Sequence, residues 1–564
     1  MWSKGSYYCN YLPCPVNYNE HTPTVKRLQN TLVMKNCGGH NFMRKHWGRN
    51  MIMMMIASSL MVAGCSSGGT TNESSPEVSK NEVHATGFPI VDQPVNLKMF
   101  TRIAPVNGPF KEMPVFQDYE KLSQVKVDFI EAQTDGFQEK KNLLFASNEL
   151  PDALFRSGIS PLEAIRYGSA GQLIPLEGLI DEYAPNLKKL MDQYPEIRSG
   201  ITTPEGHIYA IPGIVTLSAA RTDKKWINQM WLDKLNLEVP ETTEELYNVL
   251  LAFRDGDPNG NGKQDELPMT ARVGLAVVSA MSGSFGLDSQ LGYNINIEND
   301  KVSVWMGSDQ NKEMLMYLNK LYKEKLLDQE IFSHTEAQYL AKQGSGNTGF
   351  FFDQTNNNFL SIQDQYTGIA PLEGPQGDRL QSQALPIARD FGAFAITSVN
   401  KYPEVTMRWI DYFYSDEGST LLRFGREGEH YEMKDGIPYY KEDFLKEISN
   451  QAKITPYAGG GAPHLISEQV ASFINPPQVQ EAQQKLDPFM PKVRYAAPMF
   501  DEQTAQEVNI LRNDIDKYYE EQSTKFIVGA IGFDKWEQFQ TTLKKMRVEE
   551  LEKLYQDAFD KMQK

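Results

Sequence analysis

The chain has 564 residues, with 56 Lys and Arg against 73 Asp and Glu, so its formal net charge at pH 7 is −17. Residues 1–64 hold seven of the basic residues and one acid, which leaves 49 basic and 72 acidic residues in the remainder. A surface this acidic repels phosphate backbones and anionic headgroups, which excludes nucleic-acid binding and electrostatic attachment to a membrane.

The segment before the acidic body has the parts of a bacterial export signal. Basic residues within 44–49 precede the apolar run 51–63, which is too short to span a bilayer as a stable helix. The run ends in Val-Ala-Gly before Cys65, which resembles the lipobox of bacterial lipoproteins. The resemblance implies a signal peptide at 43–64 and a thiol that carries diacylglycerol and palmitate, followed by a flexible tether within 65–92. A plain signal peptide or an anchor helix is the alternative.

Residues 1–42 stand before a signal that must lie near the true N-terminus, so we expect translation to start at Met43 and the upstream stretch to be disordered if it is made. A Cys-rich metal knuckle is the alternative, although its three cysteines lack a paired C-x-x-C spacing. With Cys65 they are the four cysteines of the chain. The body therefore has no thiol for disulfides, metal binding or nucleophilic catalysis, and a large apolar core must stabilise it.

Short apolar strands alternate with helices along the body, a pattern typical of an α/β fold. We expect strands at 97–103, 125–130, 150–155, 301–306, 349–353 and 391–396, and a turn followed by a strand within 203–211. Helices are expected at 114–122, 140–147, 311–327, 402–414 and within 504–564. A strand with Trp226 leads into a helix at 229–235. Thr242 is expected to cap the helix 245–255, whose first turn holds acids. The Pro/Gly-rich stretch 365–379 is predicted to be a linker or crossover.

The most specific motif of the body is DPNGNGKQDE, residues 257–266. Oxygen-bearing side chains at its positions 1, 3, 5 and 9 and Gly at position 6 match the first half of an EF-hand calcium loop. Pro268 replaces the usual Glu at position 12, and we expect Glu266 to supply that carboxylate. The predicted Ca²⁺ ligands are Asp257, Asn259, Asn261, Asp265, Glu266 and the carbonyl oxygen of Lys263. The ion would be structural, because the loop leaves little room for substrate; a solvated Asn/Gly turn is the alternative.

Several segments together resemble one family. They are the lipobox, KWINQMWLDKL (225–235), the calcium loop, FGAFAITSVNKYPEVTMRWIDYFYSDEG (391–418), GREGEHYEMKDG (425–436) and KFIVGAIGFDKWEQF (525–539). Over nearly all of 93–564 the chain is similar to the large extracellular solute-binding lipoproteins (family 1) of ABC transporters that import oligosaccharides. The alginate-oligosaccharide binding proteins of that group carry a calcium loop of this pattern.

The resemblance implies an α/β fold of the periplasmic-binding-protein type II kind, with two lobes joined by hinge strands and extra C-terminal helices. Lobe 1 would comprise 93–215 and about 390–430, and lobe 2 about 216–389 and 431–564, with crossings near 209–226 and 384–394. It further implies a monomer, held by its lipid on the outer face of the cell membrane, that binds an oligosaccharide between the lobes. The protein would pass the sugar intact to ABC permease subunits, and it would not be an enzyme.

A sugar presents apolar C–H faces and hydroxyl groups, so its site needs aromatic platforms and a few charged or amide side chains. Trp226 is the leading candidate, because it lies at the expected first crossing. The other candidates are Tyr209, Arg221, Asn228, Phe285, Trp305, Phe352, Phe394, Tyr457, Arg102 and Asp152. For any one of them, packing in the core is the alternative interpretation.

A lipid-anchored polysaccharide hydrolase or lyase is the main rival function. It would need a pair of carboxylates or a His/Tyr/Arg set around a sugar, and 72 acids always offer some pair. No G-x-S-x-G, H-E-x-x-H or P-loop motif occurs. A surface adhesion protein is the second rival, but such modules are usually β-rich repeats, and the sequence has no internal repeat.

Overall fold

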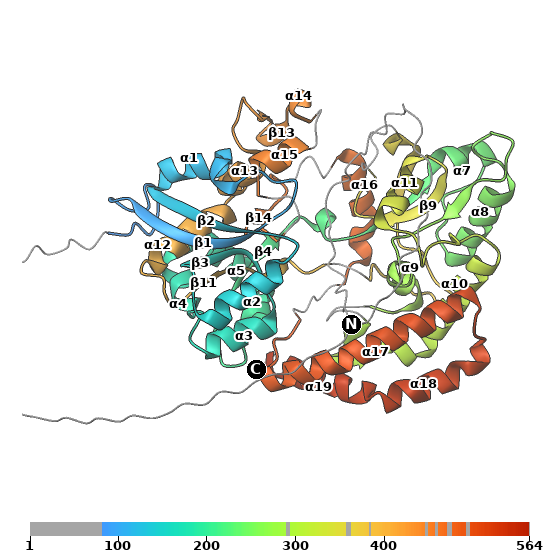
Figure 1. Cartoon of the computed structure of the whole chain (residues 1–564). Coiled ribbons are helices and arrows are strands. Elements are labelled where there is room, and N and C mark those ends of the chain that lie inside the picture. Colours follow the sequence, from blue (N-terminus) through green and yellow to red (C-terminus); the bar gives the residue numbers. More distant parts are fainter. Residues whose placement is uncertain are drawn as a thin grey trace, which may run out of the picture. The chain divides into compact units, whose positions relative to one another are not determined.

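The computed structural model describes residues 82–288, 294–356, 362–382, 385–445, 449–456, 461–470, 476–491 and 497–562. The predicted signal peptide, Cys65 and most of the tether lie outside the described residues. None of the described helices combines the length and the apolar character needed to cross a membrane. Two large sheets, each with its own hydrophobic core, organise the chain and confirm the predicted α/β class (Figure 1).

The first sheet has six strands in the order β14-β4-β11-β3-β1-β2, and we call it with its helices the first lobe. Its strands are β1 (Val95–Ile103), β2 (Val125–Gln133), β3 (Ala153–Ile159), β4 (Ile211–Val215), β11 (Ala388–Ile396) and β14 (Leu465–Ile466). β1 is parallel to β2 and β3, whereas β11 is antiparallel to its neighbours β3 and β4. Its helices are α1 (Pro114–Ser123), α2 (Phe137–Ser147), α3 (Pro161–Ser169), α4 (Glu177–Tyr183), α5 (Pro185–Gln193), α6 (Pro195–Ile201), α12 (Pro403–Asp411) and α13 (Asp416–Phe424).

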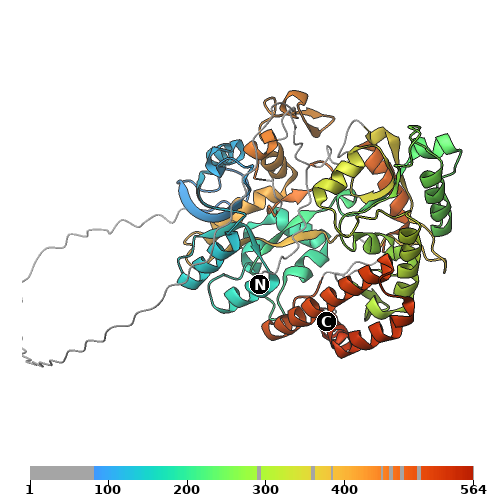
Figure 2. The same cartoon turned by 45° about the vertical axis from the view of Figure 1, so that its right-hand side comes forward.

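The second sheet has the order β10-β5-β9-β6, and we call it with its helices the second lobe. Its strands are β5 (Lys224–Asn228), β6 (Leu267–Met269), β9 (Thr348–Asp353) and β10 (Tyr366–Ile369), with the separate hairpin β7 (Ile295–Glu298) and β8 (Lys301–Val304). Its helices are α7 (Gln229–Leu235), α8 (Thr243–Asp255), α9 (Ala276–Met281), α10 (Asp309–Lys323), α11 (Glu336–Gly344), α16 (Pro477–Leu486), α17 (Glu502–Val528), α18 (Trp536–Lys545) and α19 (Val548–Met562). Figure 2 shows α17, α18 and α19 lying together, and their apolar side chains join the same core.

Local sequence signals fix where several helices begin. Ser160 starts α3 and Thr242 starts α8, each with a capping box in which its hydroxyl accepts the N–H of a Glu three residues on. The Glu side chain in turn accepts the N–H of the cap residue, so two otherwise unpaired backbone donors are satisfied. The predicted cap of α8 by Thr242 is therefore confirmed.

Three connections join the lobes. They run from β4 to β5, from β10 to β11, and from β14 to α16. A small core shared by these segments includes Val215, Trp226, Tyr366 and Ile466. The backbones are also paired, because the N–H groups of Val215 and Thr216 donate to Ile387 and Ile466 at 2.9 Å.

The stretch 431–470 differs from expectation, because we assigned residues from 431 onward to the second lobe. Its hairpin β12 (Tyr431–Lys434) and β13 (Ile437–Tyr440), with α14 (Glu442–Leu445) and α15 (Ser449–Ile454), packs on Phe424 of α13. β14 then pairs with β4. The first lobe therefore extends to β14, and the reason is non-local: strand pairing with β4 leaves no local signature in the sequence.

Candidate functional site

The predicted calcium loop, Asp257–Glu266, lies between the end of α8 and the start of β6. The carboxylate of Asp257 organises the turn by accepting three backbone N–H groups. Oδ1 accepts from Gly260 at 3.0 Å and Asn261 at 3.1 Å, and Oδ2 accepts from Gly262 at 3.1 Å. Gly260 and Gly262 have φ values of 75° and 73°, a conformation that glycine adopts without steric cost. The turn thus uses the residue types of the motif.

Two Asn side chains and Asp265 face one another across the loop. The Nδ2 groups of Asn259 and Asn261 donate to the Asp265 carboxylate at 3.0 and 2.9 Å. These hydrogen bonds, first that of Asn261 and then that of Asn259, lower the pKa of Asp265. A half-turn of an Asn amide presents its oxygen in place of its nitrogen. With a cation between them, both amides would add oxygen ligands to the carboxylate.

Glu266 supports a cation at this loop independently. Both of its carboxylate oxygens are buried, and neither has a hydrogen-bond partner. Burying an uncompensated carboxylate is costly, so a cation beside it would stabilise the fold. No group of three His, Cys, Asp or Glu side chains able to hold a metal occurs in the described part of the chain. The loop's donor set depends instead on Asn amides and the Lys263 carbonyl as well as on acids, and such a set of hard oxygens suits calcium.

Asn347 connects the loop to the second sheet. Its Oδ1 accepts from Nδ2 of Asn259 at 2.7 Å, and its Nδ2 donates to the backbone oxygen of Asp265. The next residue, Thr348, begins β9 and pairs with Leu267 of β6. The loop therefore braces the start of two neighbouring strands.

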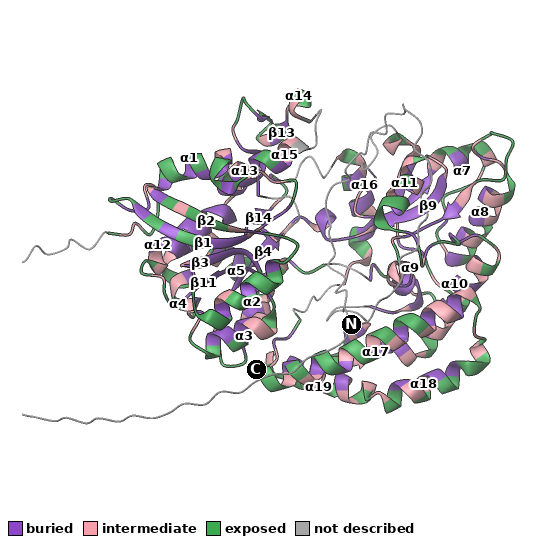
Figure 3. Ribbon diagram, viewed as in Figure 1, coloured by how far each residue is buried: buried purple, intermediate pink, exposed green. Residues whose placement is uncertain are grey.

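Most of the predicted aromatic platforms are core residues in the structure. Trp226, Phe285, Trp305, Phe352 and Phe394 are between 0 and 5% exposed. Figure 3 shows β9, the strand that contains Phe352, in the colour of buried residues. The indole N–H of Trp226 donates to the backbone oxygen of Asp353 at 3.0 Å, and that of Trp305 donates to Asp288 at 2.7 Å. Rings buried to this extent offer no face for a sugar to stack on, so we correct this part of the predicted site and leave these five residues out of it.

Of the remaining predicted residues, Tyr209 is half-buried and Arg221 is buried, and Tyr457 lies outside the described residues. Tyr209 is half-buried with its ring against Gly168 of α3, and burial followed by the charge of Glu177 raises its pKa. Arg221 is buried beside the first connection, where its Nη1 donates to the backbone oxygen of Leu385 at 3.4 Å. Tyr457 is not among the described residues.

Asn228 and Asp152 have local structural roles. Oδ1 of Asn228 caps α7 by accepting the N–H of Trp231 at 3.2 Å. Asp152 stands just before β3, and its Oδ2 accepts the N–H of Lys98 at 2.7 Å. Arg102 lies at the carboxyl end of β1, the opposite end of these parallel strands. The structure therefore does not bring Asp152 and Arg102 together.

A polar cluster that sequence reasoning missed gathers where β6 and β9 end. The guanidinium of Arg272, three residues past β6, contacts the carboxylate of Glu336 and donates to that of Asp353 at 3.0 Å. The ring of Tyr339 lies 5.3 Å from the guanidinium carbon. We call Arg272, Glu336, Tyr339 and Asp353 the Arg272 cluster. Its members are up to 81 residues apart in sequence, and only the position of Asp353 after an apolar strand hinted at a site.

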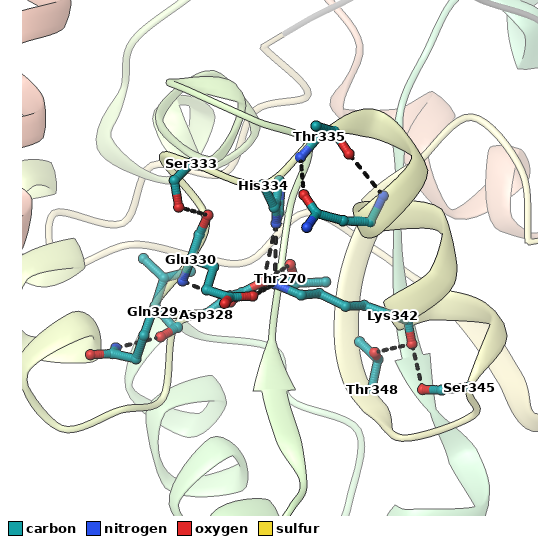
Figure 4. Close-up of polar contacts among 12 residues, drawn as sticks. Thr270, Asp328, Gln329, Glu330, Ser333, His334, Thr335, Lys342, Ser345 and Thr348 are labelled. Carbon is teal, nitrogen blue, oxygen red and sulfur yellow. Dashed lines mark hydrogen bonds and ion pairs between the residues drawn. The ribbon is translucent and has the colours of Figure 1, made fainter. Parts of the chain in front are cut away.

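A second group of polar residues holds α11 beside β6 (Figure 4). The carboxylate of Asp328 accepts from Lys342 at 2.7 Å and from the hydroxyl of Thr270 at 2.8 Å, and lies 3.4 Å from Nδ1 of His334. Burial raises the pKa of Asp328, but hydrogen bonds, led by that of Lys342, leave it below its ordinary value. Burial and then the charge of Lys342 lower the pKa of His334. Asp328 and Lys342 thus compensate each other and fasten the helix.

The first lobe has a cavity of about 550 Å³ between α1 and the edge strand β2. Its lining includes Phe116, Phe129 and Trp409, and it contains none of the predicted sugar-binding residues. The cavity therefore gives no support to that part of the predicted site.

Comparison with known proteins identifies the family to which the sequence is similar. Residues 105–420, more than half of the chain, match the family described as bacterial extracellular solute-binding protein. The fructooligosaccharide ABC transporter substrate-binding protein FusA of Streptococcus pneumoniae is 29% identical over 542 residues, covering 91% of this chain and 97% of FusA. Its structure in complex with kestose gives a TM-score of 0.69, covering 83% of this chain and 99% of that one. An EF-hand mutant of FusA in complex with fructo-nystose gives the same score.

Two further relatives are more distant. The polygalacturonan/rhamnogalacturonan-binding protein YtcQ of Bacillus subtilis is 22% identical over 411 residues, covering 71% of this chain and 77% of YtcQ. The alginate-binding protein AlgQ2, in a structure without calcium ion, is 24% identical with a TM-score of 0.66, covering 85% of this chain and all of that one. At this identity the likeness to AlgQ2 shows the fold alone.

Proposed function

The chain belongs to the family of bacterial extracellular solute-binding proteins, and we propose that it captures an oligosaccharide and delivers it unaltered to an ABC importer. The observation that carries the proposal is the similarity to FusA over 91% of this chain. Two α/β lobes joined by three connections suit it, because a ligand that contacts both lobes favours the closed form. Proteins of this family bind solutes and are not enzymes.

The first ligand to test is a fructooligosaccharide, the class in the name of FusA. Acidic oligosaccharides are the second, because YtcQ is named for binding pectic polymers. The proposed site is not a single aromatic platform, since the buried Trp226 offers no ring face. We expect the ligand contacts to come from Tyr209, Arg102 and Arg221, and from polar residues at the strand ends.

We include Ca²⁺ as a structural ion in the loop 257–266. The buried, unpartnered carboxylate of Glu266 and the two further acids of the loop, Asp257 and Asp265, support it. The EF-hand mutant of FusA and the calcium-free AlgQ2 structure point to calcium in relatives. Asp257, Asn259, Asn261, Asp265, Glu266 and the Lys263 carbonyl would hold the ion, whose charge would tie the end of α8 to the start of β6.

Attachment through a lipid on Cys65 completes the proposal. The family is extracellular, and a lipid anchor would keep the binding protein near the permease subunits it serves. Replacing Cys65 with Ala should release the protein from washed cells into the medium. Size-exclusion chromatography of the released protein should show a monomer.

Isothermal titration calorimetry against a panel of neutral and acidic trisaccharides tests the central claim. Saturable binding with one site, and recovery of unchanged sugar by mass spectrometry, is the expected result. Shortened or unsaturated products would instead identify the rival hydrolase or lyase. A protein that binds none of the panel would refute the oligosaccharide assignment.

A further inference from the structure

The Arg272 cluster combines the chemical groups that recognise sugar hydroxyls. Arg272 donates to two carboxylates, and a guanidinium beside a carboxylate offers a donor and an acceptor at fixed spacing. Neighbouring sugar hydroxyls need that combination, because each both donates and accepts. The ring of Tyr339 lies beneath the guanidinium and supports it through a cation–π contact.

The cluster is rigid at its base and exposed at its top. The side chain of Asp353 is 4% exposed, whereas those of Arg272 and Glu336 are 25% and 45% exposed. Tyr339 is fully buried, and its hydroxyl donates to the backbone oxygen of Phe352 and accepts from Gln343, both at 2.6 Å. The exposed Glu336 and the partly exposed Arg272 are thus held by two buried residues, which preorganises them for a ligand.

The cluster also lies where ligands bind in open α/β sheets, outside the carboxyl ends of strands. β6 and β9 both end there, and Lys224, which begins β5, pairs with Asp353. The first connection between the lobes ends at the same place with Asp223. Asp223 immediately precedes Lys224, so the strand pairing itself brings the hinge segment close to Asp353. Burial, followed by the charge of Asp353, raises the pKa of Asp223.

Asn356, on the segment that follows β9, has a buried oxygen atom without a hydrogen-bond donor. It is 6% exposed, and its Nδ2 donates to the backbone oxygen of Gln363 at 3.0 Å. Its Oδ1 is buried and has no hydrogen-bond partner. A buried acceptor without a donor is costly, and a ligand hydroxyl at this segment would supply the donor.

We propose that the Arg272 cluster is the second lobe's contact for an uncharged sugar ring, with Glu336 accepting from one hydroxyl and Arg272 donating to its neighbour. The inference rests on the proposed oligosaccharide binding and narrows the ligand to neutral sugars. A uronate would be a third carboxylate around one guanidinium. Repulsion from Glu336 and from the buried Asp353 would oppose its pairing with Arg272.

The test titrates the purified protein with kestose, maltotriose, xylotriose and cellotriose, and with trigalacturonate and an alginate trisaccharide. The variants are Glu336→Gln, which keeps the side chain's shape, and Arg272→Lys, which keeps the charge but loses the forked geometry. The matched control is Glu330→Gln. Glu330 is an exposed residue whose carboxylate lies 3.0 Å from Lys342 of α11, the helix that begins with Glu336. A Tm close to that of wild type establishes that each variant is folded.

We expect wild type to bind a neutral trisaccharide, and Glu336→Gln and Arg272→Lys each to weaken that binding at least tenfold. Glu336→Gln should also reduce the difference in Kd between neutral and acidic sugars. Glu330→Gln should change neither Kd. Unaltered neutral-sugar binding in both cluster variants overturns this inference and leaves the proposed function standing. Wild-type preference for the acidic sugars overturns it as well. A wild type that binds none of the sugars contradicts the proposed function itself.

Discussion

The calcium loop and the Arg272 cluster lie at opposite ends of the same two strands, and the chain assembles them in different ways. The loop precedes β6, whereas the cluster forms where β6 and β9 end. The predicted metal ligands of the loop come from ten consecutive residues. The side chains of the cluster come instead from β9, α11 and the segment after β6. Turn geometry alone therefore shapes the loop, while the cluster exists only after a helix has packed on a sheet.

The two regions also differ in charge compensation. In the cluster, the guanidinium of Arg272 lies between two carboxylates. In the loop, Asp257, Asp265 and Glu266 are three acids, and the nearby ammonium of Lys234 donates instead to the backbone oxygens of Asp257 and Pro258. We therefore expect the loop, and not the cluster, to bind a cation from solution. Each region should respond to a perturbation that leaves the other unchanged.

Removing calcium should have a large effect and should act on the loop alone. An ion present at a hundred times its Kd adds about 2.7 kcal/mol to the free energy of unfolding, so chelation should remove on the order of 3 kcal/mol. Thermal unfolding followed by circular dichroism, in excess calcium and in excess EDTA, measures the difference. The Glu336→Gln variant should show the same calcium-dependent shift in Tm. Removing calcium from the wild-type protein should change its sugar affinity less than twofold. Equal Tm values in the two buffers would rule out calcium binding at the loop.

The effect of Glu266→Gln on the free energy of unfolding should change sign between buffers with and without calcium. With calcium present we expect the ion to bind at least tenfold more weakly, a loss of about 1.4 kcal/mol, because a carboxylate ligand becomes an amide. Without calcium the same change should be neutral or stabilising by about 1 kcal/mol, because it removes a buried carboxylate that has no partner. Urea unfolding in both buffers gives the two values. Asp255→Asn, next to the loop but paired with Arg254, is the control. A loss of equal size in both buffers would make Glu266 a structural residue only.

The same contrast explains what the sequence could predict. The helix 229–235 was predicted to the residue, and the loop and the cap at Thr242 were recognised, because spacing along the chain determines each of them. The Arg272 cluster and the pairing of β14 with β4 were missed, because they depend on which strands become neighbours. No local pattern records that choice.

The aromatic candidates failed for a related reason. Trp226 and Phe352 lie on neighbouring strands of a sheet covered on both faces, so apolar residues there are buried whichever way they point. Residue type and strand position could not separate a core ring from a binding ring. Arg272 and Asp353 had the opposite problem, since charged residues after strands are common and only their convergence is informative.

Lys224 tests how dry the surroundings of the cluster are, in contrast to the exposed loop. Burial lowers the pKa of Lys224 from 10.5 to about 7, although the charge of Asp223 opposes this. The unfolded chain therefore binds this proton more tightly than the folded one between about pH 7 and 10.5, so stability should rise with pH across that window. The rise should approach but not exceed 1.4 kcal/mol per pH unit, roughly the limit for one proton. Urea unfolding from pH 6.5 to 9.5 measures it, and Lys224→Met should remove its steepest part. An identical slope in the variant would show that water reaches the ammonium.

Asn347→Ala should have the smallest effect and decides whether the two regions are energetically separate. The change removes two hydrogen bonds to the loop, from Asn259 and to Asp265, so we expect a loss of about 1 kcal/mol and weaker calcium binding. Asn347 precedes β9 and Asp353 ends it, so about 20 Å of strand separates Asn347 from the cluster at a rise of about 3.3 Å per residue. Groups this far apart usually act additively. The double variant with Glu336→Gln should therefore lose the sum of the two single losses, to within about 0.5 kcal/mol, in both stability and sugar affinity. A larger interaction energy would mean that β9 and α11 transmit the state of the calcium loop to the Arg272 cluster.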